Sequence, residues 1–236
     1  MKRFYKDAQA VAESGAKGGG WAVRLDGRSV KTPARAPLAV PGEALARAMA
    51  AEWQAQGDAI DPATMPMTGF ANATIDRVLP ALGTFRGQIA AYGASDLFCY
   101  RADEPAPLVA RQAAAWDPLL DWARARHDAH LAVTGGIMPV EQPAATLAKL
   151  RGAVEAIAPW QLAGAAVLTQ IGGSLVGMLA HLAGEIGVEA LFEATSLDER
   201  WQAERWGEDA EAAARLAARR VEFLAAARYC ALAAER

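Results

Sequence analysis

The sequence predicts an α+β protein, in which a small N-terminal mixed domain with β-hairpins and one helix (residues 1–67) precedes a larger all-α domain (residues 68–236). Up to about Met67, short alternating runs are interrupted by Gly and Pro, which is typical of strands and turns. From about Thr68 onward, the chain is rich in Ala and Leu with helical periodicity. Its 236 residues suffice for one large domain or two small ones.

The stretch WAVRLDGRSVKTP, residues 21–33, predicts a hairpin. Apolar residues alternate with their neighbours on either side of Asp26-Gly27, a pair that suits a tight turn. A phosphate-binding loop would instead place several glycines ahead of a Lys-Ser/Thr step that opens a helix, whereas Lys31-Thr32 runs into Pro33. The segment GAKGGG, residues 15–20, is predicted to be a flexible hairpin loop, and PLAVP, residues 37–41, a brief strand.

The first helix is expected after Pro41 and is expected to end at Gly57. Within it, residues at three- and four-residue spacing share one face, and Trp53 on this face is expected to be a core residue. These residues are Leu45, Ala48, Met49, Glu52 and Trp53.

No Asp, Glu, Lys or Arg occurs between Glu155 and Glu185, a length that raises the question of a membrane span. Pro, Gln, Gly, Ser and His residues dilute its apolar character too far for a lipid-facing helix. We therefore expect a helix buried at the centre of the α-domain. Four glycines would let neighbouring helices approach closely; these are Gly164, Gly173, Gly177 and Gly184.

Two further helices can be read from periodicity. The stretch PLVARQAAAWDPLLDWARARH carries an apolar stripe and a proline, Pro118, that would kink the helix or start a new one with Asp117 as N-cap. The stripe comprises Leu108, Gln112, Ala115, Leu119 and Trp122. In the last helix, expected at about 208–235, Arg220 falls within the apolar arc, either as a snorkelling edge residue or in an internal ion pair.

Composition excludes several classes of protein. The formal net charge of −3 and the lack of a Lys/Arg-rich run argue against nucleic-acid binding. Cys99 and Cys230 form no Cys-x-x-Cys pair, so we expect two small buried residues and neither a disulfide framework nor a zinc site. The N-terminal MKRFYKDAQA lacks the apolar core of a signal peptide, which predicts a cytoplasmic protein.

Residues for catalysis or metal binding are few. His127 and His130 could share a helical turn, but only His181 remains elsewhere, so no metal site is predicted. No catalytic or cofactor-binding motif is present. Four carboxylates near apolar residues could still pair as acid and base, although helix caps and ion pairs explain them better. They are Glu52, Asp76, Asp96 and Asp117.

A series of segments strongly resembles the F1 complex assembly factor 2 family, the ATP synthase assembly chaperones that hold the free alpha subunit. The segments are LDGRSVKTP, VPGEALARAMAAEWQAQGDAIDPATMPMT, ATIDRV, DLFCYRADEPAPL and QAAAWDPLLDW. Their order and spacing from Arg3 to Trp122 make the resemblance specific. Beyond Leu131 it thins to a few points, chiefly TSLDERWQAERWG. Because the chain begins almost directly at RFYK, it looks like a bacterial, cytoplasmic member.

The resemblance implies a binding protein without a cofactor. Its partner would be the alpha subunit of the F1 sector, at the surface that later meets the beta subunit; neither nucleic-acid binding nor stable membrane insertion is implied, and a monomer is expected. An unassembled subunit exposes a large apolar patch, which a chaperone covers reversibly. Two alternatives remain: an enzyme using paired carboxylates in a cleft between the two domains, and a peripheral membrane protein with residues 156–184 or an amphipathic helix exposed.

The segment SLDERWQAERWG is the candidate binding site. Ser196 as N-cap and Glu199 three residues later match a capping box, and Asp198 and Glu199 suit the helix dipole. A role in capping the helix would by itself explain why Asp198 and Glu199 occur at this position. Exposed aromatic and charged residues near a helix start nevertheless make a credible hot spot for a partner. The predicted partner-binding residues are Asp198, Glu199, Trp201 and Trp206.

Overall fold

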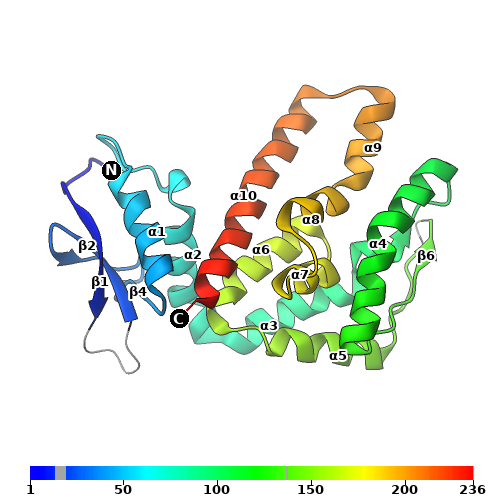
Figure 1. Cartoon of the computed structure of the whole chain (residues 1–236), viewed down its shortest axis with the longest axis horizontal. Coiled ribbons are helices and arrows are strands. Elements are labelled where there is room, and N and C mark those ends of the chain that lie inside the picture. Colours follow the sequence, from blue (N-terminus) through cyan, green and yellow to red (C-terminus); the bar gives the residue numbers. More distant parts are fainter. Residues whose placement is uncertain (14–19, 137, 236) are drawn as a thin grey trace. The chain divides into compact units, whose positions relative to one another are not determined.

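The chain folds as two structural units, and the predicted α+β class is confirmed (Figure 1). The computed structural model describes residues 1–13, 20–136 and 138–235, so all but Gly20 of the predicted loop at 15–20 lies outside the described residues. The first unit comprises Met1–Leu82, Ala158–Gly164 and Ala225–Arg236, and the second comprises Gly83–Ile157 and Ala165–Leu224. The predicted boundary after residue 67 falls within the first segment of the first unit.

A small antiparallel sheet opens the first unit. Strand β2 (Gly20–Leu25) pairs with β1 (Ala8–Glu13), β3 (Arg28–Ser29) and β4 (Ala39–Val40). Asp26 and Gly27 adopt φ angles of 47° and 77°, as a tight hairpin turn requires. The predicted hairpin and the brief strand are therefore both confirmed.

Helix α1 (Glu43–Gln54) packs against this sheet and begins and ends close to the predicted bounds. Leu45 and Met49 are fully buried, together with Ala46 and Ala50. Trp53 is only half-buried, so the prediction of a core residue there was wrong. It lies in the last turn of α1, and its ring contacts Tyr5 edge-on at 5.7 Å between centroids.

The rest of the first unit is helical. Helix α2 (Pro66–Ala73) continues into a π-helical turn at Thr74–Val78 and a 3₁₀ turn at Leu79–Ala81, where Pro80 lacks a donor for a regular α-helical hydrogen bond. The C-terminal part of α10 (Ala210–Ala234) meets this region. Its Tyr229 hydroxyl lies 2.7 Å from Thr74 Oγ1, and its ring stacks on Phe70.

The core of the second unit includes Trp116, which is 1% exposed and stacks on Phe98. The helices that lie wholly or mostly in this unit include α3 (Leu82–Ala91), α4 (Ala106–His127), α5 (Ala144–Glu155), α6 (Leu162–Gly172), α7 (Leu175–Leu182), α8 (Val188–Thr195) and α9 (Leu197–Trp206). The first residue of α3 and the first three of α6 belong to the first unit. A parallel pair, β5 (Tyr100–Arg101) with β6 (Thr134–Gly135), is an addition to the predicted all-α domain. Strands of two residues are too short to show a period of two.

The uncharged segment after Glu155 is largely buried, as predicted, but it forms two helices instead of one. The break lies at Gly173, with φ of 66°, and Ser174, whose Oγ caps α7 by accepting from the Gly177 amide. Gly164 and Gly177 sit at close helix contacts, whereas Gly173 and Gly184 serve turns with positive φ. Among the described residues, no helix is both long and apolar enough to cross a membrane.

Helix α4 runs through Pro118 without starting anew. The missing amide of Pro118 would have bonded to the carbonyl of Ala114, an exposed residue, so water can reach that carbonyl. Asp117 is no N-cap, because its Oδ1 accepts from Nη2 of Arg101 at 2.7 Å. The predicted stripe omitted Trp116, the most deeply buried residue of this helix after Ala123.

Candidate functional site

Helix α9, which carries the predicted binding residues, is tied to three other helices by ion pairs. Glu204 meets Arg111 of α4 at 2.6 Å, Arg200 meets Glu193 of α8 at 3.5 Å, and Glu199 meets Arg219 of α10 at 2.7 Å. All six side chains are substantially exposed, so each pair contributes little to stability and serves mainly to orient α9.

Trp201 anchors α9 to the second unit. It is 6% exposed, and the guanidinium carbons of Arg111 and Arg205 lie 4.8 and 4.9 Å from its ring centroid. The expectation that Trp201 is exposed was therefore wrong. Leu197 precedes it by four residues on the same face, and this spacing was the signal for an inward-facing stripe.

Trp206 is the exposed aromatic residue of α9. It is 78% exposed at the last position of the helix, which Gly207 ends with φ of 91°. An indole in this position offers a large amphipathic surface with few rotatable bonds, which is why Trp dominates binding hot spots. Of the two predicted aromatic contacts, only this one faces solvent.

Asp198 is held by a residue that sequence reasoning did not assign to the site. Its Oδ1 accepts from Nε2 of Gln112 at 2.8 Å, and Oε1 of Gln112 accepts from the Ala102 amide at 2.8 Å. Gln112 is 2% exposed, so the chain from Ala102 to Asp198 is ordered from inside the unit. In the sequence, Gln112 was visible only as a polar member of an apolar stripe.

The predicted capping box does not form. Ser196 is the N-cap of α9, but its Oγ donates to the Phe192 carbonyl at 2.6 Å and accepts nothing from the helix. Helix α8 ends at Thr195, immediately before α9, and the Phe192 carbonyl in its last turn accepts from both the amide and the hydroxyl of Ser196, so the end of α8 competes with α9 for this hydroxyl. Glu199 consequently points to Arg219 instead of to the N-cap amide.

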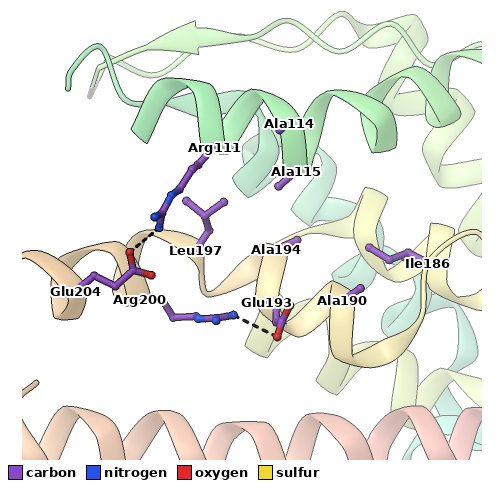
Figure 2. A pocket seen from close by; sticks show the side chains of 10 residues that line it. All are labelled: Arg111, Ala114, Ala115, Ile186, Ala190, Glu193, Ala194, Leu197, Arg200 and Glu204. Carbon is purple, nitrogen blue, oxygen red and sulfur yellow. Dashed lines mark hydrogen bonds and ion pairs between the residues drawn. The ribbon is translucent and has the colours of Figure 1, made fainter. Parts of the chain in front are cut away.

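Three hollows adjoin α9. One of about 490 Å³ lies between α4, α8 and α9, and Figure 2 shows that alanine side chains of α4 and α8 line it together with the ion pairs Arg111–Glu204 and Arg200–Glu193. A second of about 710 Å³ lies between α9 and the first half of α10. A third of about 360 Å³ is lined by Asp198, Trp201 and Trp206, among other residues. Helix α9 is thus bordered by a hollow on each of several faces.

Arg220 of α10 resolves a question that the sequence left open. Its Nε and Nη2 donate to the two carboxylate oxygens of Glu189 on α8, at 3.1 and 2.6 Å. The side chains of both residues are about half exposed. Arg220 therefore forms an ion pair, and it does so at the surface and not in the interior.

The four candidate carboxylates each have their own structural partners. Glu52 accepts from the amides of Met67 and Thr68 at the start of α2, and Asp76 accepts from the Thr32 hydroxyl and the Ala34 amide. Asp96 is fully buried and accepts from the amides of Phe98 and Val176; burial raises its pKa to about 6. Together with the Asp117–Arg101 pair, these contacts match the cap and ion-pair interpretation.

The histidines make local contacts. His130 Nε2 lies 2.9 Å from Asp128 Oδ1, while the His127 ring meets Trp122 edge-on and partial burial lowers its pKa. Across residues 1–13, 20–136 and 138–235, no group of three or more His, Cys, Asp or Glu side chains is arranged to hold a metal ion.

Comparison with known proteins identifies the family of this chain. A family model described as ATP12 chaperone protein matches residues 2–124. Among solved structures, Atp12 from Paracoccus denitrificans is 41% identical with a TM-score of 0.92, the match covering 98% of each chain. A point mutant of Atp12p from the same organism is 40% identical (TM-score 0.92; 98% of this chain, 97% of that chain). Atu1473 from Agrobacterium tumefaciens is 37% identical (TM-score 0.92; 98% and 85%). The chain therefore belongs to the ATP12 chaperone family.

Proposed function

We propose that this protein is an assembly chaperone of the F1 sector of ATP synthase that captures the unassembled alpha subunit. It shields the subunit interface of alpha until the beta subunit replaces it. Membership of a chaperone family supports the class of function. The physical need is general, because obligate interfaces are large and apolar and aggregate when left uncovered.

The binding surface in this proposal is the exposed side of α9. Asp198 and Glu199 present charge, Trp206 provides the aromatic anchor, and Trp201 supports the helix from inside. The observation that carries the proposal is the exposure of Trp206, 78%, on a helix whose orientation is held by ion pairs to its neighbours. An ordered, exposed indole beside hollows is the kind of anchor that reversible binding uses.

The proposed activity is binding without catalysis or a cofactor, by a cytoplasmic monomer. The separate structural contacts of Glu52, Asp76, Asp96 and Asp117 support the non-enzymatic part. Cell fractionation and sedimentation velocity test the location and the oligomeric state.

The test is co-purification of the tagged chain with the alpha subunit from native cytoplasm, for the parent, Trp206→Ala and Val221→Ala. Val221 is a matched control, since it is an apolar residue that is 69% exposed and lines none of the hollows beside α9. We expect Trp206→Ala to reduce capture about tenfold or more and Val221→Ala to leave it unchanged. A parent protein that retains no alpha subunit would overturn the proposed function, and equal capture by both variants would remove Trp206 from the surface.

A further inference from the structure

The groove between α9 and the first half of α10 has the lining of an unfilled helix-packing site. Figure 1 shows the two helices running antiparallel and joined by a short loop. The lining residues recur at three- and four-residue spacing on both helices, which is the pattern of a face that packs against another helix. On α9 they include Glu199, Ala203 and Trp206, and on α10 they include Ala212, Ala213, Leu216 and Arg219.

The two ends of this groove differ. The ion pair of Glu199 with Arg219 lies at the inner end, where it joins the first turn of α9 to α10. Between the ends, half-buried Ala203, Ala213 and Leu216 line the groove with small or aliphatic side chains. The outer end is the helix-helix turn, where the Trp206 indole is exposed.

The outer end is also acidic. Residues 204–211 hold four carboxylates, Glu204, Glu208, Asp209 and Glu211, against one guanidinium, so this turn carries −3. The whole chain carries the same formal charge, so the remaining residues are neutral in sum. Glu204 and Glu211 are paired with arginines, whereas Glu208 forms no ion pair with any residue that the structure describes. The free negative charge thus lies beside Trp206.

We propose that this groove is the docking site for an amphipathic helix of the partner, with small or aliphatic residues against its floor and an arginine at the end that meets Trp206. The inference rests on the proposed function and specifies the partner's chemistry at that site. A helix fits because residues of both α9 and α10 line the same groove, and a third helix would complete the packing at about 8–10 Å between axes.

The arginine of the partner is inferred from the contacts of Trp201, the other tryptophan of α9. Trp201 holds two guanidinium groups within 5 Å of its ring centroid, those of Arg111 and Arg205. Trp206 offers the same ring without such a partner among the described residues, next to the free carboxylate of Glu208. A partner arginine can stack on the indole and donate its N–H groups to that carboxylate at once.

The first test fills the groove. Ala212 and Ala214 are neighbouring exposed alanines of α10, and only Ala212 lines the groove. We expect Ala212→Trp to weaken capture of purified alpha subunit about tenfold or more, while Ala214→Trp stays within about twofold of the parent. Equal affinities for the two variants, with parental binding intact, would overturn the groove and leave the proposed function standing; loss of binding by the parent itself would overturn the proposed function.

The second test examines whether the docking segment of the partner is positively charged and helical. Glu208→Arg should weaken capture and flatten its dependence on salt, whereas Glu222→Arg, the same charge change at an exposed site outside the groove, should do neither. A photo-crosslinking residue with a small aliphatic diazirine, placed at position 212 without the bulk of an indole, should then join to a helical, arginine-bearing segment of the alpha subunit. Crosslinks to a non-helical segment, to a segment without arginine, or to a second copy of this chain would overturn the proposal.

Discussion

The Glu199 carboxylate accepts a hydrogen bond from Nη1 of Arg219 at 2.7 Å, and this pair joins the first turn of α9 to α10. We predict that Glu199→Lys weakens capture of the alpha subunit more than it weakens folding. A lysine would face Arg219 and open the inner end of the groove, while loss of an exposed ion pair costs only about 0–1 kcal/mol of stability. Thermal unfolding and alpha-subunit binding, measured on the same preparation, check both parts.

The control for this prediction reverses the pair. A double variant, Glu199→Arg with Arg219→Glu, restores opposite charges at the same two positions and should recover most of the binding. If Glu199→Lys melts early, or binds the alpha subunit as well as the parent does, Glu199 only pins α9 and the docking face lies elsewhere.

Gly164 marks a close contact of α6 with α10 in the first unit. A Cβ there would lie 2.5 Å from Cys230 Sγ and 2.7 Å from the Ala226 carbonyl oxygen. Gly164→Ala should therefore lower the free energy of unfolding by about 1–3 kcal/mol, the usual cost of overpacking. Gly69→Ala on α2 is the matched control, since its added Cβ meets nothing within 4 Å.

We expect Gly69→Ala to raise stability by about 0.5–1 kcal/mol, because alanine restricts the unfolded chain and favours helix. Urea denaturation of both variants provides the measurement. An unshifted midpoint for Gly164→Ala would show that α6 and α10 can separate at no cost, which would contradict a tight contact at Gly164.

Asp96 should make stability depend on pH. Burial raises its folded-state pKa to about 6 from an ordinary value of 3.8, so the folded protein binds more protons than the unfolded chain between these values. The contribution of this group to stability is full below about pH 4 and is lost as the pH rises through about 6. Parental stability should therefore fall with rising pH relative to that of Asp96→Asn, whose amide does not titrate.

The Asp96→Asn variant should also be less stable than the parent at pH 4, because its amide nitrogen would face an N–H of Phe98 or Val176. Urea midpoints of both proteins at pH 4, 5, 6 and 7 separate the two effects. A stability difference that stays constant over this range would contradict the raised pKa.

Local signals predicted much of the fold. The Asp26-Gly27 turn, the helix after Pro41 and the buried segment after Glu155 all formed where expected. Two of the errors arose at element ends, where neighbouring elements compete for the same groups. Trp53, one residue before the end of α1, is only half-buried, and the Ser196 hydroxyl donates to the end of α8. Neither outcome is visible in the periodicity of a single helix.

The sequence by itself determined the hairpin, the helices and the resemblance to a chaperone family, because turns, caps and helix faces depend on residues within about four positions of one another. Only the tertiary structure decided which side chains of α9 face a partner. Trp201 is buried because Arg111 of α4 covers its ring, whereas Trp206 is exposed because α4 does not cover it. Asp198 is held by Gln112, 86 positions away, and Glu199 by Arg219, 20 positions away, and such separations leave no local trace.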